Sequence, residues 1–278
     1  MTDLYLNNDH RKQLVVFYFL CFAIYFAWYF FHGLLLQQWR PVFFHNKLDL
    51  TANIIWFTDI QHHILQSASL RIVLDSLFLI LPLSLCLTGY LNLKAQYWLA
   101  IISSIFNLVY AVLLSSVTPL SIEGFTGWIL LPLMFAFKNE RSFYFAIHSF
   151  RYYFLLIFFS AGLWKFRAGG IFNTEQMSAI LVNQHASYLI DSPDDWFSRL
   201  IKYLIIHKGL SFGLYVMATI SELIFVVGFF TKKLDRLLIL ILIFFVIFDY
   251  FLMRINYFSW IAFLGCLWYS RLSKVQNA

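Results

Sequence analysis

Three ionisable side chains stand inside apolar stretches of this sequence, where they could transfer protons. Lys165 ends one such stretch, Asp249 lies near the end of another, and Asp75 lies in a third, one helical turn after Arg71. A charge at the centre of a bilayer costs about 2.5–3.5 kcal/mol on insertion scales, so buried charges usually pair or line a cavity. We therefore predict that Lys165, Asp249 and Asp75 line one pocket and carry acid–base chemistry there.

Each of these residues also has a purely structural interpretation. Asp75 could pair only with Arg71, and Lys165 could extend its ammonium group to the membrane surface along an apolar stem. The two interpretations stay open at this point, because the sequence alone does not place the three side chains relative to one another.

Four further residues have predicted roles around these stretches. Trp164 and His185 are the candidate substrate contacts, because one precedes Lys165 and the other falls on a helix predicted to lie close to it. Arg151 and Glu222 each lie eight residues from the end of their apolar stretch. Since equal counts give equal depth at about 1.5 Å per residue, we predict a structural ion pair between them.

The sequence predicts no metal site. His45, His62 and His63 share the polar segment 37–69, but no H-E-x-x-H or C-x-x-C pattern accompanies them. Phosphate-loop, dinucleotide-binding and G-x-S-x-G patterns are missing as well, so the sequence gives no support to the common nucleotide-dependent and hydrolase activities.

The composition places the chain in a membrane. Of its 278 residues, 61% are hydrophobic and 12% are charged, and the mean hydropathy is +0.74. A soluble domain carries about 25% charged residues, so this chain lacks the polar surface that water requires. The net charge of +6 comes with no basic stripe in a polar segment, so we expect no nucleic-acid partner.

The elements that must position the candidate residues are membrane-spanning helices, each about 20 apolar residues long. We predict an all-α, polytopic integral membrane bundle that forms one domain over 1–278. About eight stretches could cross the bilayer: Leu14–Leu36, Leu70–Tyr90, Tyr97–Val117, Phe125–Phe137, Phe143–Trp164, Leu210–Phe230, Leu237–Met253 and Tyr257–Tyr269.

The loop charges predict the orientation. With the N-terminus in the cytoplasm, the short inner segments hold nearly all of the loop bases, as the positive-inside rule requires. Both termini are then cytoplasmic, and we expect the protein in the inner membrane of a bacterial cell. Two long segments, 37–69 and 165–209, face outward.

The outward segment 165–209 carries signals for two amphipathic interfacial helices. Asn173 is the predicted cap of the first. Ser192, followed by Pro193 and two acids, is the predicted cap of the second, which we expect to run to about His207 and stop at Gly209.

The residues around Lys165 resemble a known family. The stretch Phe-Ser-Ala-Gly-Leu-Trp-Lys-Phe at 159–166 is similar to the Ala-Gly-x-x-Lys stretch of the vitamin K-dependent γ-glutamyl carboxylase superfamily. More broadly, the region of about 90–270 resembles the horizontally transferred transmembrane (HTTM) family, which includes peptide-toxin maturation factors of the sporulation-delaying protein B type. Further matching features are Gly170, Asn173, Met177, Glu222 in Ser-Glu-Leu-Ile, and the basic turn Thr231–Arg236.

This resemblance implies that Lys165 acts as a base and that a quinone is the cofactor. Phe248-Asp249 stands where the family has Phe-His, and the loop 118–127 has no histidine, so we expect a reaction other than glutamate carboxylation.

Three classes of function remain open. The leading one is assistance in the maturation, modification or export of a secreted peptide or protein at the outer face. The second is a quinone- or lipid-dependent enzyme. The third is a non-catalytic subunit bound to another membrane protein.

Overall fold

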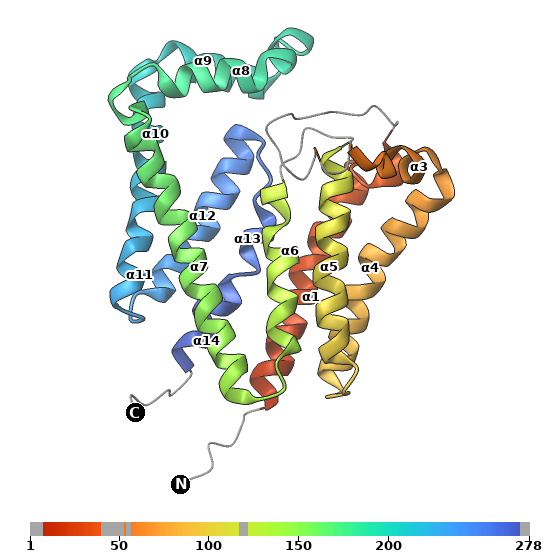
Figure 1. Cartoon of the computed structure of the whole chain (residues 1–278). Helices are drawn as coiled ribbons and strands as arrows, with labels where there is room; N and C mark the ends of the chain where they lie inside the picture. Colours follow the sequence, from red (N-terminus) through yellow and green to blue (C-terminus); the bar gives the residue numbers. More distant parts are fainter. Residues whose placement is uncertain (1–7, 40–52, 54–56, 117–121, 273–278) are drawn as a thin grey trace. The chain divides into compact units, whose positions relative to one another are not determined.

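The computed structural model describes residues 8–39, 53, 57–116 and 122–272. All regular structure in these residues is helical, as Figure 1 shows. The α-helices are α1 (Asn8–Phe31), α3 (Ile60–Gln66), α4 (Ala68–Tyr90), α5 (Gln96–Ser115), α6 (Thr126–Leu130), α7 (Glu140–Arg167), α8 (Gln176–Asp191), α9 (Trp196–Ile206), α10 (Lys208–Leu223), α11 (Val227–Phe230), α12 (Asp235–Met253), α13 (Phe258–Ile261) and α14 (Leu264–Leu272). Short 3₁₀ helices are η1 (Leu36–Gln38), η2 (Ile122–Phe125), η3 (Leu131–Ala136), η4 (Gly170–Phe172) and η5 (Ile224–Val226).

Six helical stretches in the described residues are long and apolar enough to cross a membrane: Asp9–Gln38, Ala68–Tyr90, Gln96–Ser115, Glu140–Arg167, Lys208–Phe230 and Asp235–Met253. They coincide with six of the eight predicted stretches, so the all-α prediction is confirmed, and six of the predicted spans are helices of membrane-spanning length and composition. The other two predicted stretches form the shorter helices α6–η3 and α13–α14.

The chain divides into two compact units. The first unit comprises residues 1–150 and 258–278, and the second comprises residues 151–257. Helix α7 runs through the boundary and contributes to both. Whether the two units behave as the single predicted domain stays a prediction.

In the first unit, α1, α4 and α5 are joined at one end by contacts of basic side chains. Arg11 donates to the Phe137 carbonyl oxygen at 2.8 Å, and the Lys12 ammonium lies 5.7 Å from the centre of the Tyr90 ring. The Lys138 ammonium lies 5.5 Å from the ring of Tyr97 at the start of α5. The start of α1, the α4–α5 turn and the end of η3 therefore share one end of this unit.

The segment α6–η3 runs alongside α5 in this unit. The Asn107 amide donates to the Trp128 carbonyl oxygen at 2.7 Å, and Ser104 donates to that of Ile129. Pro132 lacks a backbone donor, and beyond α6 the chain continues as a 3₁₀ helix with a longer rise of about 2 Å per residue. The side chains of α5 therefore satisfy carbonyl groups that a regular helix would bond internally.

Aromatic side chains fill the centre of the first unit. Trp128 is fully buried and packs edge-on against Phe22, with ring centres 5.3 Å apart. Phe78 and Tyr110 stack in parallel at 4.0 Å. In lipid, helix association rests on such van der Waals packing, because the surrounding hydrocarbon removes most of the hydrophobic driving force.

In the second unit, α8 and α9 form a hairpin that we call the cap (Gln176–Ile206). Figure 1 shows the cap lying across one end of α10. Its buried face packs on α10 and on the end of α12, and the shared apolar cluster is Met177, Leu181, Phe197, Ile201, Leu204, Tyr215, Leu252 and Met253.

The two amphipathic helices of the cap are present, but their ends differ from the prediction. Asp195, rather than Ser192, caps α9, because its carboxylate accepts the Phe197 backbone N–H at 3.0 Å. Asn173 does not cap the first helix, because α8 begins after Glu175; the Asn173 side chain instead accepts the Glu175 backbone N–H at 3.0 Å in the turn before α8. Gly209 lies in the first turn of α10, so the helix stop comes two residues earlier, at His207.

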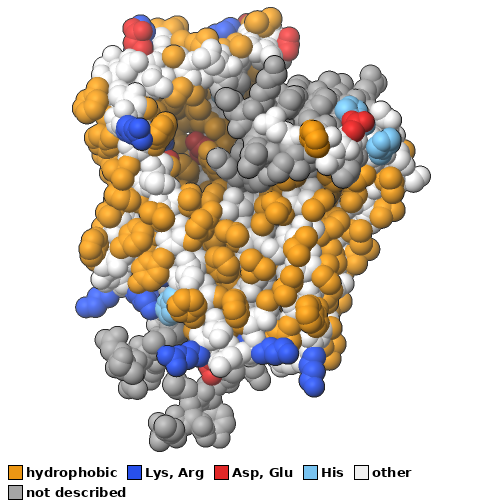
Figure 2. Space-filling view, viewed as in Figure 1, with side chains coloured by type: hydrophobic (Ala, Val, Ile, Leu, Met, Phe, Trp, Pro, Cys, Tyr) orange, Lys and Arg blue, Asp and Glu red, His pale blue; other side chains and the backbone are white. Residues whose placement is uncertain are grey.

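The flanks of the long helices are covered with exposed apolar side chains, seen in orange in Figure 2. On α12, for example, Leu240, Phe244 and Ile247 are 54%, 73% and 58% exposed. An apolar flank of this kind would be unfavourable in water and suits contact with lipid tails.

Candidate functional site

The second unit holds an ion pair between two helices of membrane-spanning length. The Lys165 ammonium on α7 donates to Glu222 Oε1 on α10 at 2.8 Å. The Glu222 side chain is 6% exposed and that of Lys165 is 26% exposed, so the lysine is the more accessible partner. The Tyr215 ring lies 5.6 Å from the ammonium group and adds a cation–π contact.

Asp249 on α12 lies within electrostatic range of this ion pair. The charges of both Lys165 and Glu222 act on its carboxyl group. One oxygen of Asp249, Oδ2, is buried and has no hydrogen-bond partner among the described residues. The cluster thus combines one base with two acids from three helices, and we refer to Lys165, Glu222 and Asp249 as the triad.

The triad changes how Lys165 can act. An ammonium held by a carboxylate at 2.8 Å is a cation and a hydrogen-bond donor. The free amine that the carboxylase resemblance implies at Lys165 does not fit this arrangement, so we derive no quinone-dependent step from it.

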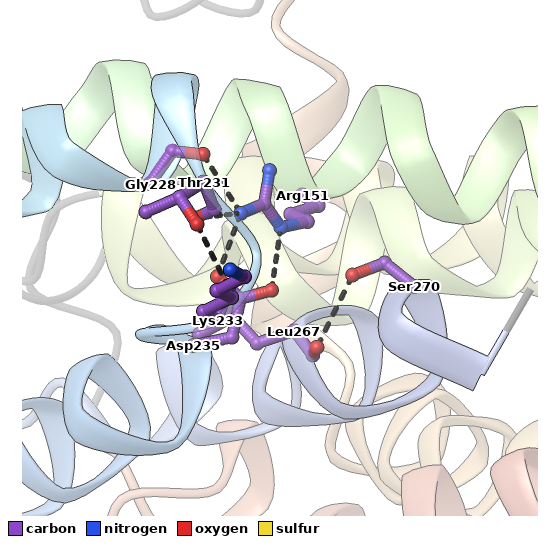
Figure 3. A network of polar contacts seen from close by, with 7 residues as sticks. All are labelled: Arg151, Gly228, Thr231, Lys233, Asp235, Leu267 and Ser270. Atoms are coloured by element: carbon purple, nitrogen blue, oxygen red, sulfur yellow. Dashed lines mark hydrogen bonds and ion pairs between the residues drawn. The ribbon is translucent and has the colours of Figure 1, made fainter.

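The predicted ion pair between Arg151 and Glu222 is wrong. Arg151 pairs instead with Asp235, the first residue of α12. The Nε and Nη2 groups of Arg151 donate to the two carboxylate oxygens of Asp235 at 2.9 and 2.6 Å, as Figure 3 shows. Nη2 also donates to the Gly228 carbonyl oxygen at 2.8 Å. Both charged side chains are fully buried.

The register of α7 against α10 and α11 explains this error. A Cβ atom on Gly162 would lie 3.2 Å from the Glu222 Cβ, and one on Gly228 would lie 2.6 Å from Leu155. Gly162 is therefore level with Glu222, while Arg151, one turn before Leu155, is level with the turn that follows α11. Equal counts from the ends of two apolar stretches give equal depth only if both helices end at the same level, and these two do not.

Asp75 has a structural role in the first unit. Its carboxylate accepts the backbone N–H groups of Leu36 and Gln37 at 3.1 and 2.8 Å and the Tyr110 hydroxyl at 2.7 Å. It therefore satisfies donors at the start of η1 that have no partner within that helix. Arg71 donates to the Leu36 carbonyl oxygen at 3.4 Å, so both charged residues of α4 hold the chain after α1. A shared pocket of Asp75 with the triad stays a prediction.

His185 is also engaged by its surroundings. It is 3% exposed, its Nε2 lies 2.6 Å from the Leu252 carbonyl oxygen, and its ring packs edge-on against Phe197. These contacts fasten the cap to the end of α12, and the substrate role of His185 stays a prediction.

Trp164 differs, because it is 61% exposed on the flank of α7, with the Arg167 guanidinium 5.2 Å from its ring. Its substrate role stays a prediction.

No group of three or more histidine, cysteine or acidic side chains could hold a metal ion in the described part of the chain. His62 bonds to the Asp59 carboxylate in that part, and His45 lies outside it.

Two acids of the polar segment around the cap have shifted ionisation. Hydrogen bonds from the Tyr188 hydroxyl, at 2.7 Å, and from the Phe197 backbone lower the pKa of Asp195. The Lys208 ammonium, bonded at 2.6 Å, lowers the pKa of Glu175. Both acids therefore stay ionised on the surface of this segment.

Reasoning from sequence missed Asp235 and Tyr215. Asp235 follows two lysines and precedes Arg236, so it reads as part of a solvated basic turn. The available signal was its position at the predicted start of an apolar helix, because an acid there can pair with a basic side chain of a neighbouring helix.

Comparison of this chain with protein-family models, curated proteins and solved structures gives no match.

Proposed function

We propose that this chain is a multi-pass membrane protein of the HTTM type that crosses the membrane eight times. The short helices α6–η3 and α13–α14 supply the two additional crossings. Supporting this count, Phe258 packs near Trp28 and Tyr269 bonds to Gln13, so α13–α14 follows most of the length of α1.

In this proposal both termini are cytoplasmic and the cap lies at the non-cytoplasmic face. The turn 231–236, at the other end of the second unit's helices, holds three bases and one acid, whereas the segment 168–207 holds two bases and four acids. Basic short loops stay in the cytoplasm, so the charge difference favours the cap on the opposite side.

At that face we propose that the protein binds a secreted peptide or protein and assists its maturation or export. The exposed face of α9 is the observation that carries this proposal. Trp196, Tyr203 and Ile206 are 61%, 51% and 74% exposed, and they share one side of the helix with Arg199 and Lys202. Tryptophan, tyrosine and arginine dominate the binding energy of protein interfaces.

The triad lies on the helices that support the cap, and in this proposal it acts on the bound partner. Lys165 is more accessible than Glu222, and its charge is the one that a partner would meet. The α9 face supplies binding, and the triad supplies an acid–base group.

Site-specific photocrosslinking tests the binding step. A photoreactive amino acid replaces Tyr203 in one variant and Phe244, a flank residue of α12, in the control. We expect the first variant to capture a secreted peptide or protein and the control to capture only lipid. Capture of lipid alone at both positions would mean that α9 rests on the membrane surface, and it would refute the proposal.

A second experiment tests the role of the triad. Lys165→Ala should leave the protein inserted and should abolish appearance of the mature partner in the secreted fraction, measured by mass spectrometry. Lys233→Ala, at the exposed basic turn, is the matched control and should mature the partner normally. Normal maturation in Lys165→Ala would remove the triad from the proposed activity.

A further inference from the structure

The triad contains two carboxyl groups and one amine, and its residues lie on helices of membrane-spanning length, where an uncompensated charge is energetically costly. Lys165 can neutralise one carboxylate, and its bond goes to Glu222 Oε1. The second oxygen of Glu222, Oε2, and Oδ2 of Asp249 are both buried without a hydrogen-bond donor among the described residues. Two carboxylates and one ammonium would leave a net charge of −1 on helices of membrane-spanning length.

Protonation of one carboxyl group removes the net charge of −1 and adds a hydrogen-bond donor to the triad. An isolated carboxylate in a low-dielectric interior costs several kcal/mol, and such groups usually become neutral instead. A protonated carboxyl group is neutral and carries an O–H donor of its own. A metal ion is disfavoured, because the described residues hold no group of three potential ligands.

We propose that the triad is a proton-binding site in which Asp249 carries an exchangeable proton at neutral pH. On release, the O–H bond at Asp249 Oδ2 breaks and the proton passes to water, which leaves a carboxylate on Asp249. The Lys165 ammonium keeps its bond to Glu222 Oε1, and its positive charge acts on the carboxylate left at Asp249. Asp249 and Lys165 are both partly exposed, so water can reach this side of the site.

Other titratable groups surround this site. Tyr215 of α10 faces the Lys165 ammonium. On α12 itself, Tyr250 follows Asp249, and on α8 the buried His185 bonds to Leu252, one turn further along α12. The hydrogen bond of His185 goes to a backbone carbonyl group, so its contacts do not supply Asp249 with a donor. This inference does not depend on whether a peptide binds the α9 face.

Infrared difference spectroscopy of the purified full-length chain, in water and in heavy water, tests the proposal. A protonated carboxyl group gives a carbonyl-stretch band that is separate from carboxylate bands and shifts in heavy water. We expect wild type to show this band at neutral pH and to lose it on raising the pH. Asp249→Asn should abolish this part of the signal, and Glu222→Gln should shift it, because it removes a negative charge that acts on Asp249.

Asp75→Asn is the matched control. Asp75 is also a buried acid on a long helix, but three donors already satisfy its carboxylate, so this substitution should leave the titrating band unchanged. A second replacement, Asp249→Glu, retains the acid and should restore a titrating band if Asp249→Asn folds poorly. Wild type and Asp249→Asn with identical bands at every pH would overturn the proposal, as would a band that disappears only in Glu222→Gln.

Discussion

The buried pair of Arg151 and Asp235 should be strongly coupled, and a double-mutant cycle measures this. Arg151→Met removes the cation and keeps an apolar stem, while Asp235→Asn removes the negative charge and keeps the shape of the side chain. The double variant removes both charges. Neither side chain has any exposed surface in wild type, so water cannot screen the charge that either single variant leaves behind.

The structure sets the expected magnitudes. Breaking a buried pair by removing one partner costs about 3–5 kcal/mol, because the remaining charge stays buried. Each single variant should lose that much free energy of unfolding. The double variant buries no charge, but the carbonyl oxygen of Gly228 loses its donor, which costs about 1–3 kcal/mol. The double variant should therefore be more stable than either single variant.

Unfolding in mixed micelles with increasing denaturing detergent, followed by tryptophan fluorescence, gives the four free energies. Arg199→Ala, which removes an exposed arginine of the cap, is the control and should change stability by less than about 0.5 kcal/mol. A double variant as unstable as the sum of the two single variants would mean that the two charges do not interact, and the argument from burial would fail.

Three further predictions concern other parts of the chain. Asp75→Ala should destabilise the first unit by about 1–3 kcal/mol because it leaves buried backbone donors unsatisfied, which unfolding in micelles measures; a stability equal to wild type would contradict this. Gly127→Ala should lower the melting temperature, because the new Cβ would lie 2.1 Å from the Ser259 carbonyl oxygen; an unchanged melting temperature would show that the backbone there can move freely. The depressed pKa of Asp195 means that its capping contribution is fully present above its unfolded pKa of about 3.9 and is lost as the pH falls through the lower folded value. Hydrogen-exchange protection in the first turn of α9 should decrease over that acidic range in wild type but not in Asp195→Asn. If protection depends on pH in the same way in both proteins, the Asp195 carboxylate does not stabilise the start of α9.

The sequence by itself determined the class of the protein and the bounds of its long helices. Five predicted stretches agree with the observed helical stretches to within three residues at each end, among them Leu70–Tyr90 with α4 and Leu237–Met253 with α12, and the sixth, Leu14–Leu36, overlaps α1. This succeeds because hydrophobicity over about 20 residues is a local property, and a membrane imposes the same length on every span. The existence of the two cap helices was also predictable, since their apolar periodicity and start signals lie within short segments.

Only the tertiary structure decided which charged groups meet. Counting residues predicted Glu222 as the partner of Arg151, whereas the axial register between α7 and its neighbours pairs Arg151 with Asp235 and Glu222 with Lys165. Register depends on close contacts such as that of Gly228 with Leu155, between residues far apart in the chain. A shift of one helical turn moves a side chain by about 5.4 Å, more than the length of a hydrogen bond, so counting residues from helix ends cannot identify the partners.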